Sequence, residues 1–441
     1  MKIGIIGLGF VGLSFGSVLA SKGHLVIGVD IDKEKLKKIK NGVVPFYEPG
    51  LQSILKKSLK KDLKISSNIS DLEKCGLIFV TVGTPQKRNG EIDLTIVKNV
   101  INKIGKLLSK TRHKPIIIIK STVIPGTTQR VILPILQHVS GKKVGKDFGL
   151  VTNPEFLRET MAVNDTLYPH VIVLGGDNNI FLKKVKRFYS NLHHNVPIVL
   201  TNYGTAEIIK YANNSFLATK ISFINQIASI CEEIPNANID DVARTIGLDP
   251  RIGKLFLDAG PGYGGSCLPK DVKAIIGFST KMGVNSTLFA AVEKINEQQI
   301  NSIIKLLKQN IGKTQGKKIA VLGIAFKPET DDTRDSVSVK LVSRLVKLGA
   351  KIIIHDPKAI ENARKIFHDK VKYQKSVTLA VKDCQCAIIM TGWKEYEKIN
   401  NETIKHMAKK FIIDSRRIIS NKNLNAKYFA IGLGQKIWKF L

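Results

Sequence analysis

The sequence predicts an α/β protein made of three consecutive regions: a parallel-sheet region, a helical region and a second parallel-sheet region. Strand-like and helix-like segments alternate over the first 200 residues, which is typical of parallel sheets. Residues 205–233 contain neither glycine nor proline and carry apolar side chains at helical spacing, so they predict a single long helix. Alternation resumes near Gly312. We therefore expect domains at residues 1–200, 201–311 and 312–441.

The expected strands are short apolar runs bounded by glycine, proline or charged residues. In the first region these runs are residues 2–7, 25–30, 77–82, 115–120, 149–152 and 171–175. In the third region they are residues 317–322, 351–355 and 387–390. Residues 11–21, between the first two strands, have helical character.

The composition is that of a globular protein. Hydrophobic residues make up 43% of the 441 residues and charged residues 24%, which excludes a disordered chain. No apolar run reaches the roughly 18–20 residues that a membrane-spanning helix needs. The N-terminus has one lysine followed by glycines, unlike a secretory signal. We expect no cleaved export signal and no membrane anchor.

The net charge is unusually positive, with 69 lysines and arginines against 36 acidic residues, a net of +33. Such an excess raises the hypothesis of a nucleic-acid or anionic-surface partner. However, lysine clusters such as residues 33–40 and 56–64 are interleaved with leucine and isoleucine at helical spacing. This pattern indicates solvent-facing helices. We predict neither a nucleic-acid nor a membrane partner.

The cysteines indicate a reducing compartment. Their number is odd, with Cys75, Cys231, Cys267, Cys384 and Cys386, which favours free thiols and a cytoplasmic location. Cys384 and Cys386 lack the spacing and the second pair of a zinc site. We predict no metal.

The first chemical motif is GLGFVG, residues 7–12, between an expected strand and an expected helix. In a dinucleotide site Gly7 permits the turn, Gly9 lets a pyrophosphate approach, and Gly12 lets the helix pack on the strand. Asp30 follows Gly12 by 18 residues, at the end of the second strand. Its carboxylate would accept hydrogen bonds from the adenosine ribose and repel a 2′-phosphate. The motif therefore predicts NAD as cofactor.

The second motif is GYGGSCLPKD, residues 262–271. Cys267 follows a flexible glycine run that allows a ligand to come close. A helix beginning near Pro269 would place its positive end beside the thiol and lower the thiol pKa. A buried, inert thiol is the alternative interpretation. In an NAD enzyme, a cysteine nucleophile can oxidise an aldehyde through a thioester.

These motifs and several others, in order along nearly the whole chain, resemble the UDP-glucose/GDP-mannose dehydrogenase family. The further matches are VDID (29–32), YEPGL (47–51), VGTP (82–85), STVIPGT (121–127), NPEFLRE (153–159) and AFKPETDDTRDS (325–336). The resemblance implies two Rossmann-like domains with parallel sheets, joined by a long central helix in an all-α dimerisation region. It also implies a homodimer or higher homo-oligomer.

The resemblance implies a four-electron oxidation of a sugar-nucleotide C6 alcohol to a uronate by two NAD. Cys267 matches the family nucleophile, which forms a thiohemiacetal and then a thioester that water hydrolyses. Lys210 and Asn214, four residues apart on the long helix, match residues that stabilise the developing oxyanion. Asp271 and Thr122 match the pair that positions water, and Glu155 matches an acid/base.

The resemblance also implies binding residues. Those implied for the cofactor are Gly7, Gly9, Phe10, Val11, Gly12, Asp30, Lys35, Thr84, Thr122, Glu159, Lys270 and Arg334. Those implied for a UDP-sugar substrate are Glu155, Phe156, Leu157, Glu159, Lys210, Asn214, Arg251, Phe256, Gly264 and Lys327. Arg251 is expected to reach the substrate across a dimer interface, and Arg334 to reach the NAD pyrophosphate from the third domain.

Some positions depart from the family pattern or leave the branch open. Phe10 stands where the family usually has tyrosine. The third region keeps only Gly323 of a dinucleotide fingerprint, which suits a nucleotide-sugar site. Residues 79–94 and 153–159 also resemble GDP-mannose dehydrogenases, whereas GLDPRIG (247–253) and GPGYGGSC (260–267) resemble the UDP-glucose branch. UDP-galactose, the 4-epimer of UDP-glucose, and N-acetylated UDP-sugars remain open as alternative substrates.

Two other classes of function remain as alternatives. A two-electron hydroxyacid dehydrogenase shares the glycine motif and the long helix, but needs neither Cys267 nor a complete third domain. A basic nucleic-acid-binding protein would bind with a steep salt dependence, yet the sequence carries no helix-turn-helix, zinc-finger or aromatic RNA-binding signature.

Overall fold

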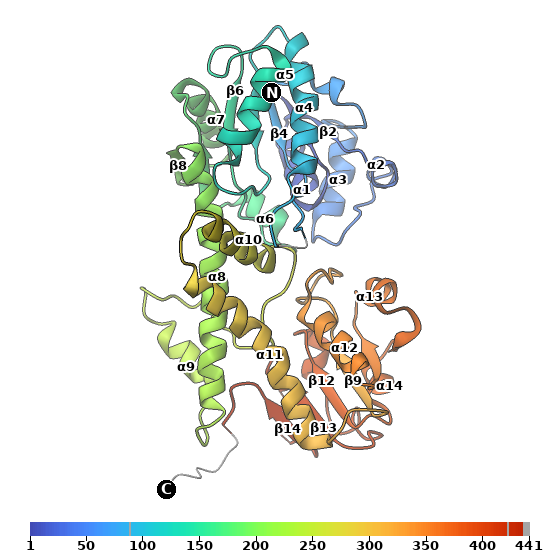
Figure 1. Cartoon of the computed structure of the whole chain (residues 1–441). Helices are drawn as coiled ribbons and strands as arrows, with labels where there is room; N and C mark the ends of the chain where they lie inside the picture. The colour runs from blue at the N-terminus through green and yellow to red at the C-terminus, as the bar shows by residue number, and fades with distance from the viewer. Residues whose placement is uncertain (88–89, 421–422, 435–441) are drawn as a thin grey trace. The chain divides into compact units, whose positions relative to one another are not determined.

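The computed structural model describes residues 1–87, 90–420 and 423–434. The chain divides into two compact units, Met1–Asn213 and Asn214–Leu441, each organised around its own sheet (Figure 1). We refer to them as unit 1 and unit 2.

Unit 1 holds an eight-stranded sheet in the order β3-β2-β1-β4-β5-β6-β7-β8. Its strands are β1 (Lys2–Ile6), β2 (Leu25–Val29), β3 (Leu63–Ser66), β4 (Leu77–Val80), β5 (Ile116–Ile119), β6 (Gly149–Thr152), β7 (Ile172–Gly175) and β8 (Ile198–Thr201). The chain order reverses between β1 and β4, which creates the crevice where parallel α/β sheets bind ligands. The expected strands of this region are confirmed, while β3 and β8 are additional.

The helices of unit 1 cover both faces of this sheet. They are α1 (Phe10–Ser21), α2 (Lys33–Lys40), α3 (Leu51–Leu59), α4 (Thr95–Lys110), α5 (Leu133–Ser140), α6 (Ala162–Leu167) and α7 (Asn179–Leu192), with short turns η1 (Ile69–Leu72) and η2 (Thr128–Ile132). Strand β5 is a continuous run of four isoleucines because both of its faces are buried. Ile116 and Ile118 pack into one core, and Ile117 and Ile119 pack into the other.

The sheet of unit 1 departs from the prediction of a purely parallel sheet at one pair of strands. Strand β6 meets β7 antiparallel through the Thr152–Gly175 pair, whereas β7 and β8 are parallel to each other. The connection between β6 and β7 contains only the short helix α6, which packs on α1. The connection spans residues 153–171, which is long enough for a crossover between parallel strands, so its length alone does not account for the reversal.

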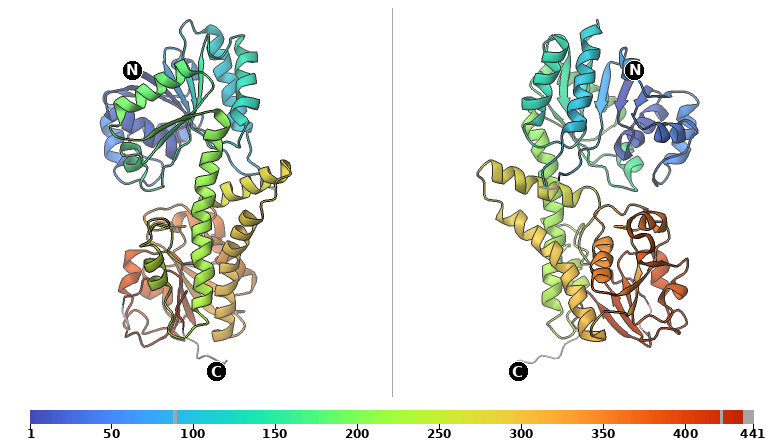
Figure 2. Two further views of the ribbon diagram at one scale, coloured as in Figure 1. Left: turned by 90° about the vertical axis from the view of Figure 1, so that its left-hand side faces the viewer. Right: turned by 45° about the vertical axis from the view of Figure 1, so that its right-hand side comes forward.

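The predicted long helix is α8, Tyr203–Cys231, drawn as the long green helix of Figure 2. It begins two residues before the expected segment and ends two residues before its end. The division between units 1 and 2 falls within this helix. Unit 2 continues with α9 (Ile239–Ile246), α10 (Leu268–Lys281) and α11 (Thr287–Ile311). Helices α10 and α11 pack together as a helical hairpin.

Unit 2 ends in an all-parallel six-stranded sheet in the order β11-β10-β9-β12-β13-β14. Its strands are β9 (Lys318–Leu322), β10 (Lys351–His355), β11 (Lys372–Tyr373), β12 (Cys386–Ile389), β13 (Phe411–Asp414) and β14 (Lys427–Ala430). Its helical segments are α12 (Val337–Lys347), α13 (Ile360–Phe367), η3 (His368–Lys370), α14 (Val377–Val381) and η4 (Lys394–Lys398). The predicted α/β class with two Rossmann-like sheets is confirmed.

Within the described residues, no helix combines the length and apolar character needed to cross a membrane.

Candidate active site

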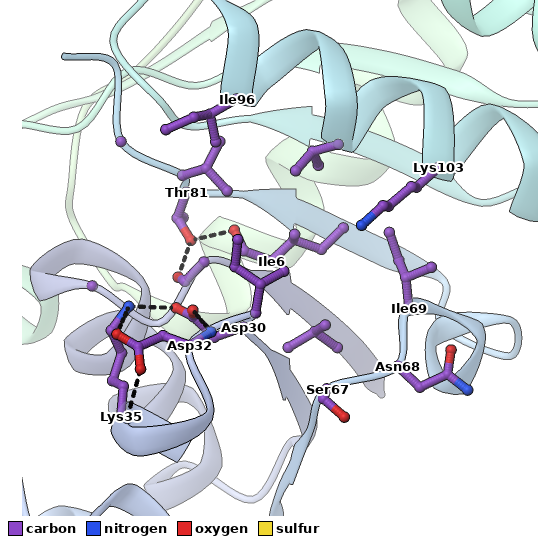
Figure 3. A pocket seen from close by; sticks show the side chains of 17 residues that line it. Ile6, Asp30, Asp32, Lys35, Ser67, Asn68, Ile69, Thr81, Ile96 and Lys103 are labelled. Atoms are coloured by element: carbon purple, nitrogen blue, oxygen red, sulfur yellow. Dashed lines mark hydrogen bonds and ion pairs between the residues drawn. The ribbon is translucent and has the colours of Figure 1, made fainter. Parts of the chain in front are cut away.

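A cavity of about 670 Å³ opens at the switch point between β1 and β4 of unit 1. It is lined by the glycine loop after β1 and by Asp30, Asp32 and Lys35 after β2. Figure 3 shows these charged groups at one side and the Lys103 side chain, from α4, on another. This is the location that a dinucleotide occupies in a doubly wound sheet.

Each of the three glycines of the first motif is required for a different structural reason. Gly7 has φ +97°, a left-handed conformation that favours glycine. A Cβ on Gly12 would overlap the carbonyl oxygen of Gly7 and lie 2.6 Å from Thr81 Oγ1, so this glycine lets α1 pack on β1. A Cβ on Gly9 would meet nothing within 4 Å. The space beside Gly9 is therefore open, as the approach of a pyrophosphate requires.

Gly12→Ala and Gly9→Ala should therefore separate folding from cofactor binding. We expect Gly12→Ala to lower stability by about 1–3 kcal/mol because the added methyl group overpacks the β1–α1 contact. Gly9→Ala should keep the wild-type Tm but lose the Tm increase that NAD produces, since its methyl group enters the ligand space. Thermal unfolding with and without NAD measures both effects. A wild-type Tm for Gly12→Ala would contradict this assignment.

Asp30 retains acceptor capacity for a ligand. Its Oδ2 accepts from Leu8 N at 2.7 Å and Lys35 Nζ at 2.9 Å, and its Oδ1 accepts from Asp32 N at 3.0 Å. Burial alone would raise the pKa of Asp30, but these donors outweigh burial and lower it. Two carboxylate oxygens offer about four lone-pair positions. An ionised acceptor with room for a ribose hydroxyl is thus present, with Lys35 beside it.

The remaining cofactor candidates of unit 1 lie at the same edge of the sheet. Thr84 Oγ1 donates to the Thr122 carbonyl at 2.8 Å, which joins the loops that follow β4 and β5. Phe10, the departure from the family pattern, packs its ring against Phe46 at 5.7 Å between centroids. Val11 is the second residue of α1, and Glu159 lies in the segment between β6 and α6.

Lys210 and Glu155 form a buried ion pair in unit 1. Lys210 Nζ lies 3.1 Å from Glu155 Oε1, with side-chain exposures of 6% and 9%. Glu155 Oε2 also accepts from Leu157 N at 2.6 Å, and Lys210 lies 5.4 Å from the Phe156 ring centroid. Burial raises the pKa of Glu155, but Lys210 and the other donors lower it overall. The structure thus brings these four predicted residues together with an ionised Glu155.

A buried lysine that the sequence did not single out lies next to this pair. Lys120 Nζ donates to Asn153 Oδ1 at 3.1 Å and lies 4.9 Å from the Phe15 ring centroid. Tyr189 OH donates to the same Asn153 oxygen at 2.5 Å. Burial lowers the pKa of Lys120 to about 8, against the opposing charge of Glu155. Its position directly before STVIPGT was the available signal.

Cys267 lies in unit 2 as the exposed N-cap residue of α10. The other four cysteines are buried. The expected helix begins at Leu268 with Pro269 in its first turn, and the Cys267 carbonyl accepts from Asp271 N at 2.9 Å. A helix N-terminus favours the negatively charged thiolate.

Asp271 contacts two other predicted residues of unit 2, Lys270 and Asn214. Its side chain is 2% exposed and forms an ion pair with Lys270. Its Oδ2 accepts from Asn214 Nδ2 at 2.6 Å. Asn214 is therefore a buried, hydrogen-bonded residue and not an exposed helix residue. One turn along α10 from Cys267, this network provides a fixed carboxylate.

The other substrate candidates of unit 2 fall into two groups. Gly264 and the glycine after it pack on the loop segments of the C-terminal sheet, since Cβ atoms there would lie 2.6 Å from Asp335 O and 2.7 Å from the Phe326 ring. The Nζ of Lys327 lies 5.7 Å from the centroid of the Phe326 ring. Arg251, in contrast, has an 87% exposed side chain and pairs with Asp249.

Arg334 and Phe256 also lie in unit 2, where Arg334 pairs with Asp332 and Phe256 has φ +66°. Across the described ranges, no group of three His, Cys, Asp or Glu side chains is arranged to hold a metal ion.

The C-terminal sheet has the same glycine turn after its first strand as the sheet of unit 1, but the aspartate after its second strand has different hydrogen-bond partners. Gly323 has φ +95°, close to Gly7, and Asp356 follows β10 as Asp30 follows β2. Asp356, however, accepts five donors from the protein. These are the backbone N–H groups of Ile324, Ala325, Lys358 and Ala359 and the Trp393 indole.

Comparisons with known proteins agree with this arrangement. The chain matches the UDP-glucose/GDP-mannose dehydrogenase family over its NAD binding domain (residues 1–193), its central domain (204–298) and its UDP binding domain (320–421). The UDP-glucose 6-dehydrogenase TuaD of Bacillus subtilis is 39% identical over 98% of this chain and 93% of its own length. The UDP-glucose 6-dehydrogenase AglM of Haloferax volcanii is 37% identical over 96% of this chain and 98% of its own.

Solved structures show the same fold. A UDP-glucose dehydrogenase from Pyrobaculum islandicum superposes with a TM-score of 0.92 at 31% identity, covering 98% of both chains. A UDP-D-ManNAc dehydrogenase from Pyrococcus horikoshii gives 0.88 at 28% identity, covering 99% of this chain and 100% of its own.

The two sheets, the cofactor cavity and the matched domains define an NAD-dependent oxidoreductase acting on nucleotide sugars. The chain belongs to the UDP-glucose/GDP-mannose dehydrogenase family. The glycine loop and Asp30 fit NAD, the cofactor of that family's N-terminal domain.

Proposed function

We propose that the protein is an NAD-dependent UDP-glucose 6-dehydrogenase that converts UDP-glucose to UDP-glucuronate. The observation that carries this proposal is Cys267, the exposed thiol at the N-terminus of α10, one turn before the buried Asp271. A two-electron hydroxyacid dehydrogenase has no need of such a thiol. Relatives that carry the UDP-glucose 6-dehydrogenase name match over nearly the whole chain, which supports UDP-glucose over the other sugars.

The reaction balances as two dehydrogenations and one hydrolysis. NAD, when bound, would supply the hydride acceptor for each dehydrogenation. The C6 alcohol first loses a hydride and a proton to give the aldehyde. The Cys267 thiolate then adds to the carbonyl carbon, and the oxygen takes up a proton to form a thiohemiacetal. Loss of a second hydride and proton gives the thioester. Water then cleaves the C–S bond, releasing the carboxylate and the thiol. Hydrolysis makes the sequence effectively irreversible.

The chain's own residues have distinct proposed roles in these steps. Lys210 and Asn214 stabilise the oxyanion, a task that suits groups held rigidly by buried partners. Asp271, with Thr122, orients the hydrolytic water, and its contact with Asn214 supports this assignment. Glu155 exchanges protons with the substrate or with water. Its ionised state next to Lys210 favours a role as base at the start of the cycle.

Binding roles remain as the family resemblance assigns them. We propose that the cofactor is held by Gly7, Gly9, Phe10, Val11, Gly12, Asp30, Lys35, Thr84, Thr122, Glu159, Lys270 and Arg334. The UDP-sugar is held by Glu155, Phe156, Leu157, Glu159, Lys210, Asn214, Arg251, Phe256, Gly264 and Lys327. The exposure of the Arg251 side chain is consistent with a contact to a second subunit.

A homodimer and the three-domain division at 1–200, 201–311 and 312–441 belong to the same proposal. Helix α8 carries three exposed apolar side chains at seven-residue spacing, Phe216, Phe223 and Ile230, with exposures of 65%, 50% and 49%. Residues seven apart lie on one stripe of a helix, the pattern of helix–helix association. The five free thiols support a reducing cytoplasm as the site of action.

The test is a substrate panel of UDP-glucose, UDP-galactose, UDP-N-acetyl sugars and GDP-mannose, each with NAD and with NADP. We expect two NADH per UDP-glucose, with UDP-glucuronate as product. One NADH per sugar would exclude the thioester route. A preference for an N-acetylated sugar would favour the second candidate function, a UDP-N-acetylhexosamine 6-dehydrogenase. The similar fold of a UDP-D-ManNAc dehydrogenase suggests this candidate.

A further inference from the structure

The glycine-rich segment that leads to Cys267 is held by two buried amide side chains of unit 2. Asn225 Oδ1, on α8, accepts from Gly260 N at 2.8 Å. Asn296, on α11, makes two bonds to one residue: its Oδ1 accepts from Tyr263 N at 2.8 Å and its Nδ2 donates to Tyr263 O at 3.0 Å. The exposures of Asn225 and Asn296 are 0% and 6%.

The fit between Asn296 and the loop leaves little freedom. Gly262 has φ +105°, a conformation that side chains rarely adopt. A Cβ on Gly262 would lie 2.6 Å from Asn296 Oδ1. The amide therefore fixes a backbone that glycine alone would leave flexible, and only an unsubstituted residue fits against it.

A second contact connects the same helix to the other side of Cys267. Tyr263 OH donates to Glu293 Oε2 at 3.3 Å, and Glu293 Oε1 pairs with Lys273 Nζ at 3.2 Å. Lys273 belongs to α10, whose N-cap residue is Cys267. Helix α11 thus holds both the loop before the cysteine and the helix after it.

We propose that Asn296 is a positioning residue for Cys267: its paired bonds to Tyr263 fix the loop backbone and so hold the sulfur at the N-terminus of α10. This role rests on the proposed function, because it matters for catalysis only if Cys267 is the nucleophile. The geometric part, control of the thiol's surroundings, stands independently. The Tyr263–Glu293–Lys273 chain supports the same placement from the helix side.

Alkylation of Cys267 measures this role without any turnover. The four other cysteines are buried, so iodoacetamide should label Cys267 selectively in the native protein, and Cys267→Ala gives the blank. Asn296→Ala removes both bonds. Asn296→Asp keeps the volume and one acceptor, but turns a carboxylate oxygen toward the Tyr263 carbonyl. Asn301→Ala, an exposed asparagine of the same helix, is the matched control.

We expect both Asn296 variants to change the rate of Cys267 alkylation, followed against pH, by about threefold or more. Their kcat should fall by about ten- to a hundredfold with a smaller change in KM. The Asn301 control should match the wild type in both. Rates are taken well below each variant's Tm, with labelled sites identified by peptide mass.

Two results would overturn the proposal. One is an alkylation profile of folded Asn296→Asp and Asn296→Ala that coincides with the control. The other is labelling that rises equally at all five cysteines, which marks general loosening. If wild-type protein forms no uronate from any sugar of the panel, the proposed function fails, yet the alkylation comparison still decides the positioning role.

Discussion

Cys267→Ser should abolish uronate formation while leaving NAD binding unchanged. A serine hydroxyl is almost wholly protonated at neutral pH, whereas a cysteine thiol is far more acidic and its thiolate is an intrinsically strong nucleophile. Without the covalent adduct, the second hydride loss has no thiohemiacetal to act on. We expect a fall in the rate of UDP-glucuronate formation of about a thousandfold or more, as for removal of other catalytic nucleophiles.

The measurement follows uronate by chromatography and NADH by absorbance in the same sample, with an aldehyde-trapping reagent present. Trapped aldehyde together with one NADH per sugar would show that only the first dehydrogenation survives. Cys231→Ala removes a buried thiol of the same unit and serves as the control, which should keep the wild-type stoichiometry. Full uronate formation by Cys267→Ser would remove the cysteine from the mechanism.

Lys210→Met should cost both stability and activity. Removing one partner of a buried ion pair leaves the other charge, here Glu155, without its hydrogen-bonded counter-charge, at a cost of about 3–5 kcal/mol. Losing a preorganised oxyanion contact should lower kcat by about 10²–10³. Because the folded-state pKa of Glu155 is lowered, the pair's stabilisation is present above the unfolded carboxyl pKa. It should be lost as the pH falls through the folded value.

Urea unfolding and steady-state rates of Lys210→Met measure these two effects. The double variant Glu155→Gln/Lys210→Met should recover much of the stability but none of the activity, because it removes the orphaned charge and not the catalytic defect. Arg244→Met breaks an exposed ion pair, with side chains 73% and 60% exposed, and should cost no more than about 1 kcal/mol. A loss of that small size for Lys210→Met would contradict the buried-pair assignment.

The fold could be predicted where local patterns repeat a known physical period. The isoleucines at 116–119, the glycine turn at 7–12 and the uninterrupted apolar spacing of α8 each required only a short window. Strand β8 was missed although its sequence, IVLT, is an apolar and β-branched run after a proline, which is an ordinary strand signal. Strand β11 has only two residues. The reversal between β6 and β7 depends on how residues 153–171 pack on the rest of unit 1, which no local pattern encodes.

The candidate site divides in the same way. The glycine motif placed the cofactor cavity, and GYGGSC placed an exposed thiol at a helix N-terminus, as expected. The partners could not be predicted, because they join distant segments. Glu155 pairs with Lys210, and Tyr263 bonds to Asn296. An asparagine within a long amphipathic helix gives no sign, in sequence, of whether it faces water or a loop.

Asp30 and Asp356 follow the second strand of the first and of the second sheet, respectively, and they show that the same turn can serve different functions. Asp30 has three protein donors, whereas Asp356 has five. A carboxylate oxygen that already accepts two or three N–H groups has no lone pair left for a hydroxyl. An acidic residue at this position is therefore not by itself the mark of a ribose site. Its unused acceptor capacity decides, and that quantity can be counted in any protein with this turn.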